Sequence, residues 1–270
     1  MSGTFYVIGT PIGNLDDITI RQLDTLGAVD FICAEDTRVT LKLLNRFEIK
    51  KPLVSFHEHS SKADAQKIID RLLAGESCGI VTDAGMPCIS DPGAELISKC
   101  RECGIDVESV PGPTAFATAF ALTGVKDTKF TFVGFMPDKK TDKVAILRKY
   151  ANLDMPLIFY VAPHDLAQTA QIMYEVLGDR KAYVVRELTK IYESVTITSL
   201  ANFSSEERGE IVLIIEGKSM DENPLLNMTI EEHLNHYIEL GMDKKEAVKK
   251  VAQDRGITKN DVYQVAINIK

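Results

Sequence analysis

Several kinds of segment are missing from this chain of 270 residues, and each absence excludes a class of protein. The purest apolar run, Ile211–Ile215, is far shorter than the stretch that a membrane-spanning helix needs. The first residues contain no basic region that leads into an apolar run. We therefore expect a strand at the amino terminus rather than a signal peptide, and we expect no membrane segment.

The five cysteines do not form a recognisable metal or disulfide pattern. Their number is odd, and most lie in apolar or helical surroundings, which favours reduced thiols in a cytoplasmic protein. Cys100 and Cys103 have the spacing of half a zinc site, but no second Cys or His pair accompanies them. Because structural zinc takes four protein ligands, we expect no metal there.

The nucleotide and hydrolase motifs with fixed spacing are also missing. Gly9 and Gly13 are four residues apart with Pro11 between them, so the dinucleotide-binding fingerprint fails. No Gly-Lys-Ser/Thr follows, which disfavours phosphoryl transfer, and no Gly-x-Ser-x-Gly nucleophile elbow is present. His57 and His59 flank Glu58 without further metal ligands, so a hydrogen-bonding role is favoured over a metal site.

Positive charge is in deficit. With 31 Lys and Arg against 39 Asp and Glu, the formal net charge is -8. This balance disfavours a protein that coats nucleic acid nonspecifically, because such binding rests on neutralising phosphates. Two local clusters, within residues 139–149 and 244–259, are either solvated helix faces or phosphate contacts.

What is present is the pattern of an ordinary globular α/β protein. Hydrophobic residues make up 45% and charged residues 26% of a chain long enough for two domains. Five strand-like runs in the first half alternate with helical patterns: Phe5–Ile8, Phe31–Ala34, Leu53–Phe56, Gly79–Thr82 and Val107–Val110. This alternation predicts a mostly parallel sheet with helices on both faces.

The pattern changes after Gly124. Five further strand candidates surround an amphipathic helix over Asp165–Leu177: Phe130–Phe135, Leu157–Val161, Ala182–Arg186, Tyr192–Thr198 and Ile211–Ile215. The short connection Glu187–Ile191 indicates a hairpin, so the second sheet is expected to be mixed.

The last forty-odd residues are helical in pattern. Capping boxes are expected at Thr229 with Glu232 and at Asp243 with Glu246, and the third helix repeats Val262, Val265 and Ile269. We expect three parts: an α/β domain at 1–123, a second α/β domain at 124–220, and a helix-turn-helix-like extension at 225–270. The extension is either a phosphate-binding module or a solvated helical cap.

Each predicted strand of the first half is followed by a loop of unusual composition. These loops are rich in Gly, Pro and acidic residues, and they begin at Gly9, Glu35, His57, Asp83 and Pro111. In parallel sheets ligands bind at the carboxyl ends of the strands. The five loops therefore predict one site at one edge of the sheet.

Eight motifs in order carry a resemblance to a known family. They are Gly9-Thr-Pro-Ile-Gly-Asn-Leu-Asp-Asp17, Ala34-Glu-Asp-Thr-Arg38, Ser55-Phe-His-Glu-His59, Thr82-Asp-Ala-Gly-Met-Pro-Cys-Ile-Ser-Asp-Pro-Gly93, Pro111-Gly-Pro-Thr114, Gly134-Phe-Met-Pro137, Tyr160-Val-Ala-Pro-His164 and Arg186-Glu-Leu-Thr-Lys190. The chain resembles the ribosomal RNA-methylating branch of the tetrapyrrole methylase fold family. The resemblance extends from the first strand through the helical tail.

The resemblance implies an activity. It implies a cytoplasmic enzyme, a homodimer, that uses S-adenosylmethionine to methylate the 2′-oxygen of a cytidine in the decoding region of 16S ribosomal RNA. Methyl transfer is an in-line displacement, so alignment supplies much of the acceleration and no metal is needed. Two alternatives stay open: methylation of a tetrapyrrole precursor or a modified protein residue, and a noncatalytic RNA-binding protein with a vestigial cofactor site.

The resemblance also implies site residues. Those expected to line the cofactor are Thr10, Pro11, Asp83, Gly85, Met86, Ile89, Ser90, Thr114, Ala115, Ala162 and Pro163. Close approach of the backbone to the cofactor is expected at Gly85 and Gly112, which lack a Cβ. Val161-Ala162 stands where a Glu-Ser pair is more familiar, so only a backbone contact is expected at Ala162.

The catalytic candidates are charged residues at predicted strand ends. We expect Glu35 or Asp36 to contact or deprotonate the ribose hydroxyl, a weak acid that needs help to attack. Arg38, Arg186 and Lys190 are expected to hold the flanking phosphates. An Asp–Arg pair such as Asp36 and Arg38 is equally well explained as a plain salt bridge.

Overall fold

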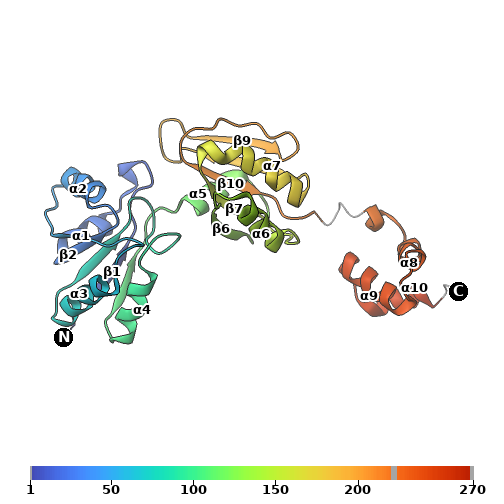
Figure 1. The fold of residues 1–270 in the computed structure, drawn as a ribbon, viewed down its shortest axis with the longest axis horizontal. Helices are drawn as coiled ribbons and strands as arrows, with labels where there is room; N and C mark the ends of the chain where they lie inside the picture. Colours follow the sequence, from blue (N-terminus) through green and yellow to red (C-terminus); the bar gives the residue numbers. More distant parts are fainter. Residues whose placement is uncertain (1, 220–223, 268–270) are drawn as a thin grey trace. The chain divides into compact units, whose positions relative to one another are not determined.

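The computed structural model describes residues 2–219 and 224–267. The chain forms two compact units, residues 1–217 and residues 218–270 (Figure 1). The first unit holds two five-stranded sheets, and the second is helical. No helix in the described residues is long and apolar enough to cross a membrane.

The first sheet is entirely parallel. Its strands are β1 (Phe5–Ile8), β2 (Phe31–Ala34), β3 (Leu53–Ser55), β4 (Cys78–Val81) and β5 (Val107–Val110), in the order β3-β2-β4-β1-β5. All four pairings are parallel, as the alternating pattern predicts. Every residue of β2 and β4 is buried, which explains why these strands read as continuous apolar runs.

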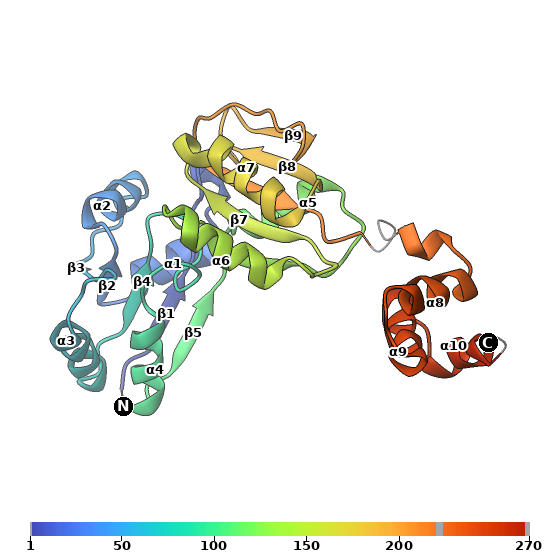
Figure 2. The ribbon, with the colours of Figure 1, turned by 45° about the vertical axis from the view of Figure 1, so that its right-hand side comes forward.

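Helices cover both faces of this sheet (Figure 2). Helices α1 (Ile20–Ala28) and α2 (Thr37–Arg46) bury Leu26 and Leu44 in one cluster with Ile8 and Ile32. Helices α3 (Lys62–Leu73) and α4 (Ala94–Glu102) pack on the other face against Phe5 and its neighbours. The predicted layers are therefore confirmed.

The second sheet is mixed, also as predicted. Its strands are β6 (Thr131–Phe135), β7 (Leu157–Val161), β8 (Lys181–Arg186), β9 (Ser194–Ser199) and β10 (Ile211–Ile215), in the order β6-β7-β10-β8-β9. Only β6 and β7 are parallel, and β8 and β9 form the expected hairpin.

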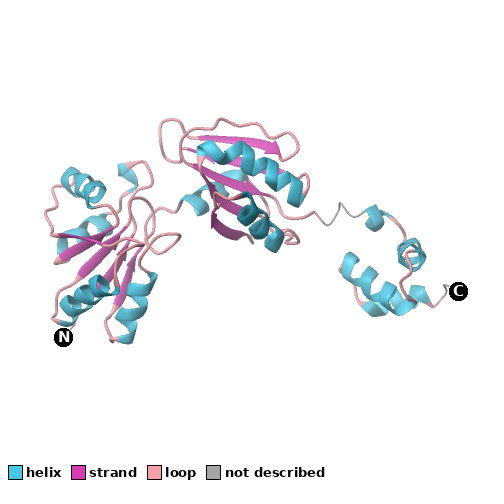
Figure 3. Ribbon diagram, viewed as in Figure 1, coloured by secondary structure: helices cyan, strands magenta, loops and turns pink. Residues whose placement is uncertain are grey.

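Helices flank the second sheet (Figure 3). Helices α6 (Lys140–Tyr150) and α7 (Leu166–Leu177) pack on one face, and α5 (Ala115–Thr123) packs on the other, where Ala119 meets Ile158 and Val212. Helix α5 thus lies within predicted domain 1–123 but packs against the sheet that follows it. The three-part division at 1–123, 124–220 and 225–270 stays a prediction.

Strand boundaries differ from the predicted ones by one or two residues. β4 begins and ends one residue earlier than predicted, at Cys78 and Val81. β9 starts at Ser194 rather than Tyr192, because residues 190–193 form the turn in which the Glu193 amide bonds to the Lys190 carbonyl. Side-chain pattern alone does not resolve such turns.

The helical unit contains α8 (Ile230–Glu239), α9 (Lys244–Arg255) and α10 (Lys259–Ala266). Its own core includes Leu234, Val251 and Val262. Thr229 and Glu232 form the predicted capping box, whereas Asp243 caps α9 from one side only, by accepting from the amides of Lys245 and Glu246. The predicted helical position at Ile269 lies outside the described residues.

Candidate active site

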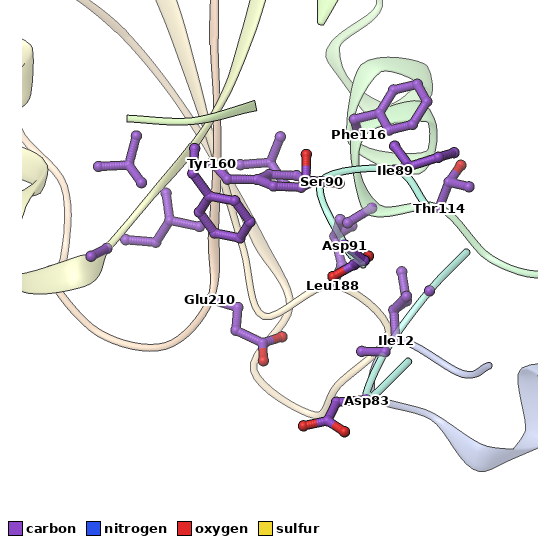
Figure 4. A pocket seen from close by; sticks show the side chains of 18 of the residues that line it. Ile12, Asp83, Ile89, Ser90, Asp91, Thr114, Phe116, Tyr160, Leu188 and Glu210 are labelled. Carbon is purple, nitrogen blue, oxygen red and sulfur yellow. The ribbon is translucent and has the colours of Figure 1, made fainter. Parts of the chain in front are cut away.

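A cavity of about 550 Å³ lies within residues 1–217, at the carboxyl ends of the first sheet. Its lining comes from loops after β1, β2, β4 and β5 and from several segments of the second sheet. Figure 4 shows side chains from both sources around one hollow. The volume lies in the range typical of small-molecule sites.

Thr10 joins two of these loops without lining the cavity. Its amide donates to the Gly85 carbonyl at 2.9 Å, and the Gly85 amide donates back at 3.1 Å. The Thr10 hydroxyl, which is buried, donates to the Thr82 carbonyl at 3.1 Å. These hydrogen bonds hold the loop at residues 9–13 against the loop at residues 82–85, beside the cavity.

Position 112 needs glycine because other loops of the protein lie close to it, and not only because a cofactor is expected to approach it. A Cβ on Gly112 would lie 2.5 Å from the Gln22 side chain and 2.9 Å from the Gly9 Cα. The crowding comes from the protein's own loops. At Gly85 a Cβ would make only ordinary contacts, but φ is +87°, a left-handed conformation that favours glycine.

The loop after β4 has an unusual backbone. Gly85, Cys88, Ser90 and Gly93 all have positive φ, and the values at the two non-glycine residues are 68° and 66°. Such conformations are rare away from glycine and cluster at functional sites. The result here is that Ile89, Ser90 and Asp91 all line the cavity.

One side of the cavity is acidic. Glu35, Asp83 and Asp91 line it. Burial, followed by the negative charge of Asp83, raises the pKa of Glu35, and burial is also the main cause that raises the pKa of Asp83. Burial, and then the charges of Glu35 and Asp83, raise the pKa of Asp91 to about 6. Three carboxylates with raised pKa values favour a cationic ligand.

Aromatic and apolar side chains also line the cavity. The Tyr160 ring packs edge-on against Phe135, with 5.0 Å between ring centroids, and both residues line the cavity. Ile12 and Leu188 add apolar surface. Burial raises the pKa of the Tyr160 hydroxyl, so it stays protonated at neutral pH. A ligand with an aromatic part and a positive centre matches this mixed lining.

Most of the predicted cofactor residues meet at this cavity. Those in the lining are Asp83, Gly85, Met86, Ile89, Ser90, Thr114, Ala115, Ala162 and Pro163. Thr10 and Pro11 are buried behind it. Of the catalytic candidates, only Glu35 is part of the lining.

Asp36 and Arg38 pair with each other outside the lining. Asp36 is the N-cap of α2 and accepts from the Arg38 guanidinium at 2.6 Å. Hydrogen bonds with the Arg38 side chain and amide lower the pKa of Asp36 to about 2. The Arg38 side chain is 87% exposed, which leaves its outer face open to a phosphate. The geometry thus includes the salt bridge that the sequence left open.

Arg186 and Lys190 bind carboxylates of their own chain. Arg186 is buried, donates to the Arg208 carbonyl at 3.1 Å and pairs with Glu206 at 3.1 Å. Lys190 pairs with Glu187 at 2.9 Å and with Glu210, a cavity residue, at 3.1 Å. Both cations brace the segments beside the cavity, and their role toward phosphates stays a prediction.

Several lining residues were not singled out from the sequence. Asp91, Phe135 and Tyr160 lie inside motifs that carry the family resemblance, but the motifs alone do not indicate that these side chains face a cavity. Glu210 lies outside the motifs and lines the cavity because of the position of the second sheet, which no local pattern predicts. Across the described part of the chain, no three His, Cys, Asp or Glu side chains are arranged to hold a metal ion.

Comparison with known proteins defines the class. The profile of the Tetrapyrrole (Corrin/Porphyrin) Methylases matches residues 4–204, and the chain belongs to this family. Solved structures share its fold: diphthine synthase, with a TM-score of 0.64 at 14% identity, covers 81% of this chain and 91% of its own. Uroporphyrin-III-C-methyltransferase from Thermus thermophilus, with a TM-score of 0.57 at 18% identity, covers 79% and 94%.

More similar relatives specify the branch. Ribosomal RNA small subunit methyltransferase I of Bacillus subtilis (strain 168) is 43% identical over 99% of this chain and 95% of its own length. The protein of that name from Synechocystis sp. is 35% identical over 99% of both chains. The one from Thermotoga maritima is 42% identical, with 99% of its length matching 80% of this chain. Within the family, the chain belongs with these methyltransferases.

Proposed function

We propose that this protein transfers a methyl group from S-adenosylmethionine to a ribose 2′-oxygen of a cytidine in the decoding region of 16S ribosomal RNA. The observation that carries the proposal is the near full-length match, at 43% identity, to a ribosomal RNA small subunit methyltransferase I. Nucleoside and ribose specificity rest on the resemblance of the eight motifs.

The cavity suits the methyl donor. S-adenosylmethionine combines an aromatic adenine with a positively charged sulfonium, and both aromatic and acidic side chains line the cavity. A related fold, Uroporphyrin-III C-methyl transferase from Thermus thermophilus, is described as complexed with S-adenyl homocysteine. When bound, the donor supplies an activated methyl group. We assign its contacts to the nine predicted residues in the lining, with Thr10 and Pro11 as supports behind them.

The protein's own contribution is alignment and charge. In-line displacement requires the attacking oxygen, methyl carbon and sulfur to lie on one line, so the rigid loops of the cavity provide much of the catalysis. Glu35 lines the cavity and is proposed to contact the ribose hydroxyl. The RNA strand is proposed to be oriented by two pairs of residues, Asp36 with Arg38 and Arg186 with Lys190. Arg38 would act through its exposed guanidinium.

The acceptor is proposed to be RNA rather than a tetrapyrrole or a modified protein residue. The relatives at 35–43% identity carry the ribosomal name, whereas diphthine synthase and the porphyrin enzyme are below 20% identity. Those distant structures bear on the fold alone. The ribosomal substrate also implies a cytoplasmic enzyme.

We further propose that the protein works as a homodimer through its second sheet. Ile191 and Tyr192, in the β8–β9 connection, are 91% and 78% exposed, and Ile197 on edge strand β9 is 60% exposed. Exposed apolar side chains on an edge strand are typical of association sites. Ile197→Lys is expected to produce monomers in analytical ultracentrifugation. A wild-type protein that sediments as a monomer would contradict this assignment.

The experiment that tests the activity is direct. Small ribosomal subunits without the modification are incubated with the protein and methyl-labelled S-adenosylmethionine, and the label is then mapped to a nucleotide. Label at one cytidine ribose in the decoding region is expected. Donor binding by calorimetry without any labelled RNA points to another acceptor, and absence of donor binding favours a noncatalytic RNA-binding protein.

A further inference from the structure

Asp91 is a carboxylate without a partner inside the cavity. In the described residues it forms neither a hydrogen bond nor an ion pair with a cation. Figure 4 shows it among the lining side chains, with Tyr160 to one side and Asp83 below. A half-buried carboxylate that no cation or hydrogen-bond donor of the protein stabilises is typical of a group that acts on a bound ligand.

Its position is imposed by the backbone. The left-handed residues Cys88 and Ser90 precede Asp91, and Gly93, with φ +127°, follows it. A Cβ on Gly93 would lie 2.7 Å from the Cys88 sulfur and 2.8 Å from Ile80, so the turn folds tightly back on the sheet. The loop therefore holds Asp91 in place without a side-chain hydrogen bond.

Glu210 is paired with Lys190 and Asp138 is exposed, whereas the other acids of the first-sheet loops are already engaged. Asp36 is bound by Arg38, and Asp83 accepts the Asp36 amide at 3.2 Å. Glu35 accepts a hydrogen bond from the Asp83 backbone. Each of these bonds stabilises the ionised carboxylate and so weakens it as a base.

We propose that Asp91 is the base that accepts the proton of the attacking ribose hydroxyl. This assignment rests on the proposed function. The sugar oxygen forms a bond to the methyl carbon, the carbon–sulfur bond breaks, and its electron pair stays on sulfur as a neutral thioether. The hydroxyl proton passes to the Asp91 carboxylate, so charge and atoms balance.

The surroundings of Asp91 support this role. Glu35 and Asp83 face it from the first sheet, Cys88 from its own loop and Tyr160 from the second sheet. Burial and the two acids raise its pKa to about 6, which makes it a stronger base than an ordinary carboxylate while it remains mostly ionised at pH 7.

The test uses the full chain with substitution Asp91→Asn. Loss of a general base typically lowers turnover by about 10²–10⁴-fold, and the donor dissociation constant should stay within about threefold. Asp91→Glu should recover part of the rate. Asp24→Asn, on the exposed face of α1, is the matched control and should leave the rate unchanged.

The pH profile separates a base from a structural residue. For wild type, kcat/KM for the donor should rise with pH with an apparent pKa of about 6 and then level off, and Asp91→Asn should lose that limb. The assignment is overturned if Asp91→Asn keeps near wild-type turnover, keeps the limb, or loses donor binding. It is equally overturned if Glu35→Gln or Asp36→Asn removes the limb instead.

Failure of the wider proposal gives a different result. Wild-type protein that binds the donor but leaves the small subunit unlabelled overturns the proposed function, and the Asp91 assignment with it. Labelled subunits with wild type together with an unaffected Asp91→Asn variant overturn the Asp91 assignment alone.

Discussion

At the scale of single residues, the site depends on places where two loops approach closely. Gly9 follows β1 and Gly112 follows β5, and a Cβ on Gly9 would lie 2.7 Å from the Gly112 Cα and amide nitrogen. Met86 is part of the same contact, because the Gly112 amide donates to its sulfur at 3.2 Å. Three of the cavity's loops therefore share one junction in which no extra atom fits.

Gly9→Ala should weaken both the fold and the donor site. The new methyl group meets backbone atoms, which have no rotamer with which to move away, so a loss of about 1–3 kcal/mol in unfolding free energy is expected. Urea unfolding and donor calorimetry measure the two effects. Gly27→Ala in α1, where a Cβ meets nothing within 4 Å, should be neutral or stabilising by up to about 1 kcal/mol. Equal stability of the two variants would refute the close-approach argument.

At the scale of secondary-structure elements, a buried ion pair joins α6 to the start of α7. Lys143 is completely buried and bonds Asp165, which also accepts from the Thr169 hydroxyl at 3.0 Å. A neighbouring pair between the same helices, Lys140 with Glu175, is exposed. The two pairs differ mainly in their access to water.

Lys143→Met should destabilise the protein strongly. It leaves the Asp165 carboxylate without its cation in a mostly buried place, which typically costs about 3–5 kcal/mol. Lys140→Met removes an exposed partner and should change stability by about 1 kcal/mol or less. Chemical denaturation of both variants provides the comparison. A small effect at Lys143 would mean that Asp165 gains water or loses its charge.

The helical unit contains a buried histidine that should make its stability depend on pH. Burial, and then the charge of Arg255, lowers the pKa of His233, whose Nδ1 accepts from the Arg255 guanidinium at 3.1 Å. Because the folded pKa lies below the unfolded value of about 6.5, the unfolded state binds more protons as pH falls below 6.5. Stability of α8–α10 should therefore decrease on acidification through that window.

Circular dichroism of the full chain between pH 7.5 and 5 tests this behaviour, with His233→Gln as the variant that should lose the pH dependence. His236→Gln is the control, since His236 lies on the same helix but is less buried. An unchanged pH dependence in His233→Gln would assign the effect to another group.

At the scale of the whole molecule, the helical unit is a candidate accessory to the methyltransferase. It has its own core, and the Thermotoga maritima relative matches over 80% of this chain, a share as large as residues 1–217. Its cations divide into two groups. Arg255 bonds the carbonyls of Leu225 and Thr229, whereas Lys245, Lys249 and Lys259 are exposed.

A chain shortened to residues 1–217 should fold and bind the donor as well as the full protein. Its affinity for small subunits should fall, and the dependence of that affinity on salt should become shallower as phosphate contacts are lost. Lys249→Ala with Lys259→Ala in the full chain should reproduce part of this loss. Unchanged RNA affinity and salt dependence would make the helical unit a structural cap.

The sequence alone predicts the strands, the helices and many of the loop residues that line the cavity, because both depend on local order along the chain. Strand-helix alternation predicts the parallel sheet, and the loops at its carboxyl edge contain most of the predicted cofactor residues that line the cavity. Only the tertiary structure decided which carboxylates are buried beside the cavity. The sequence shows Glu35, Asp36 and Asp91 simply as three carboxylates. In the structure, Arg38 pairs with Asp36 and the Asp83 backbone forms a hydrogen bond with Glu35. Asp91 has no such partner among the described residues. The pair between Asp36 and Arg38 is local and is one of the alternatives that the sequence already offers. The burial of Glu35 and Asp91 is set by segments that are distant in sequence, and it determines which carboxylate is available for chemistry.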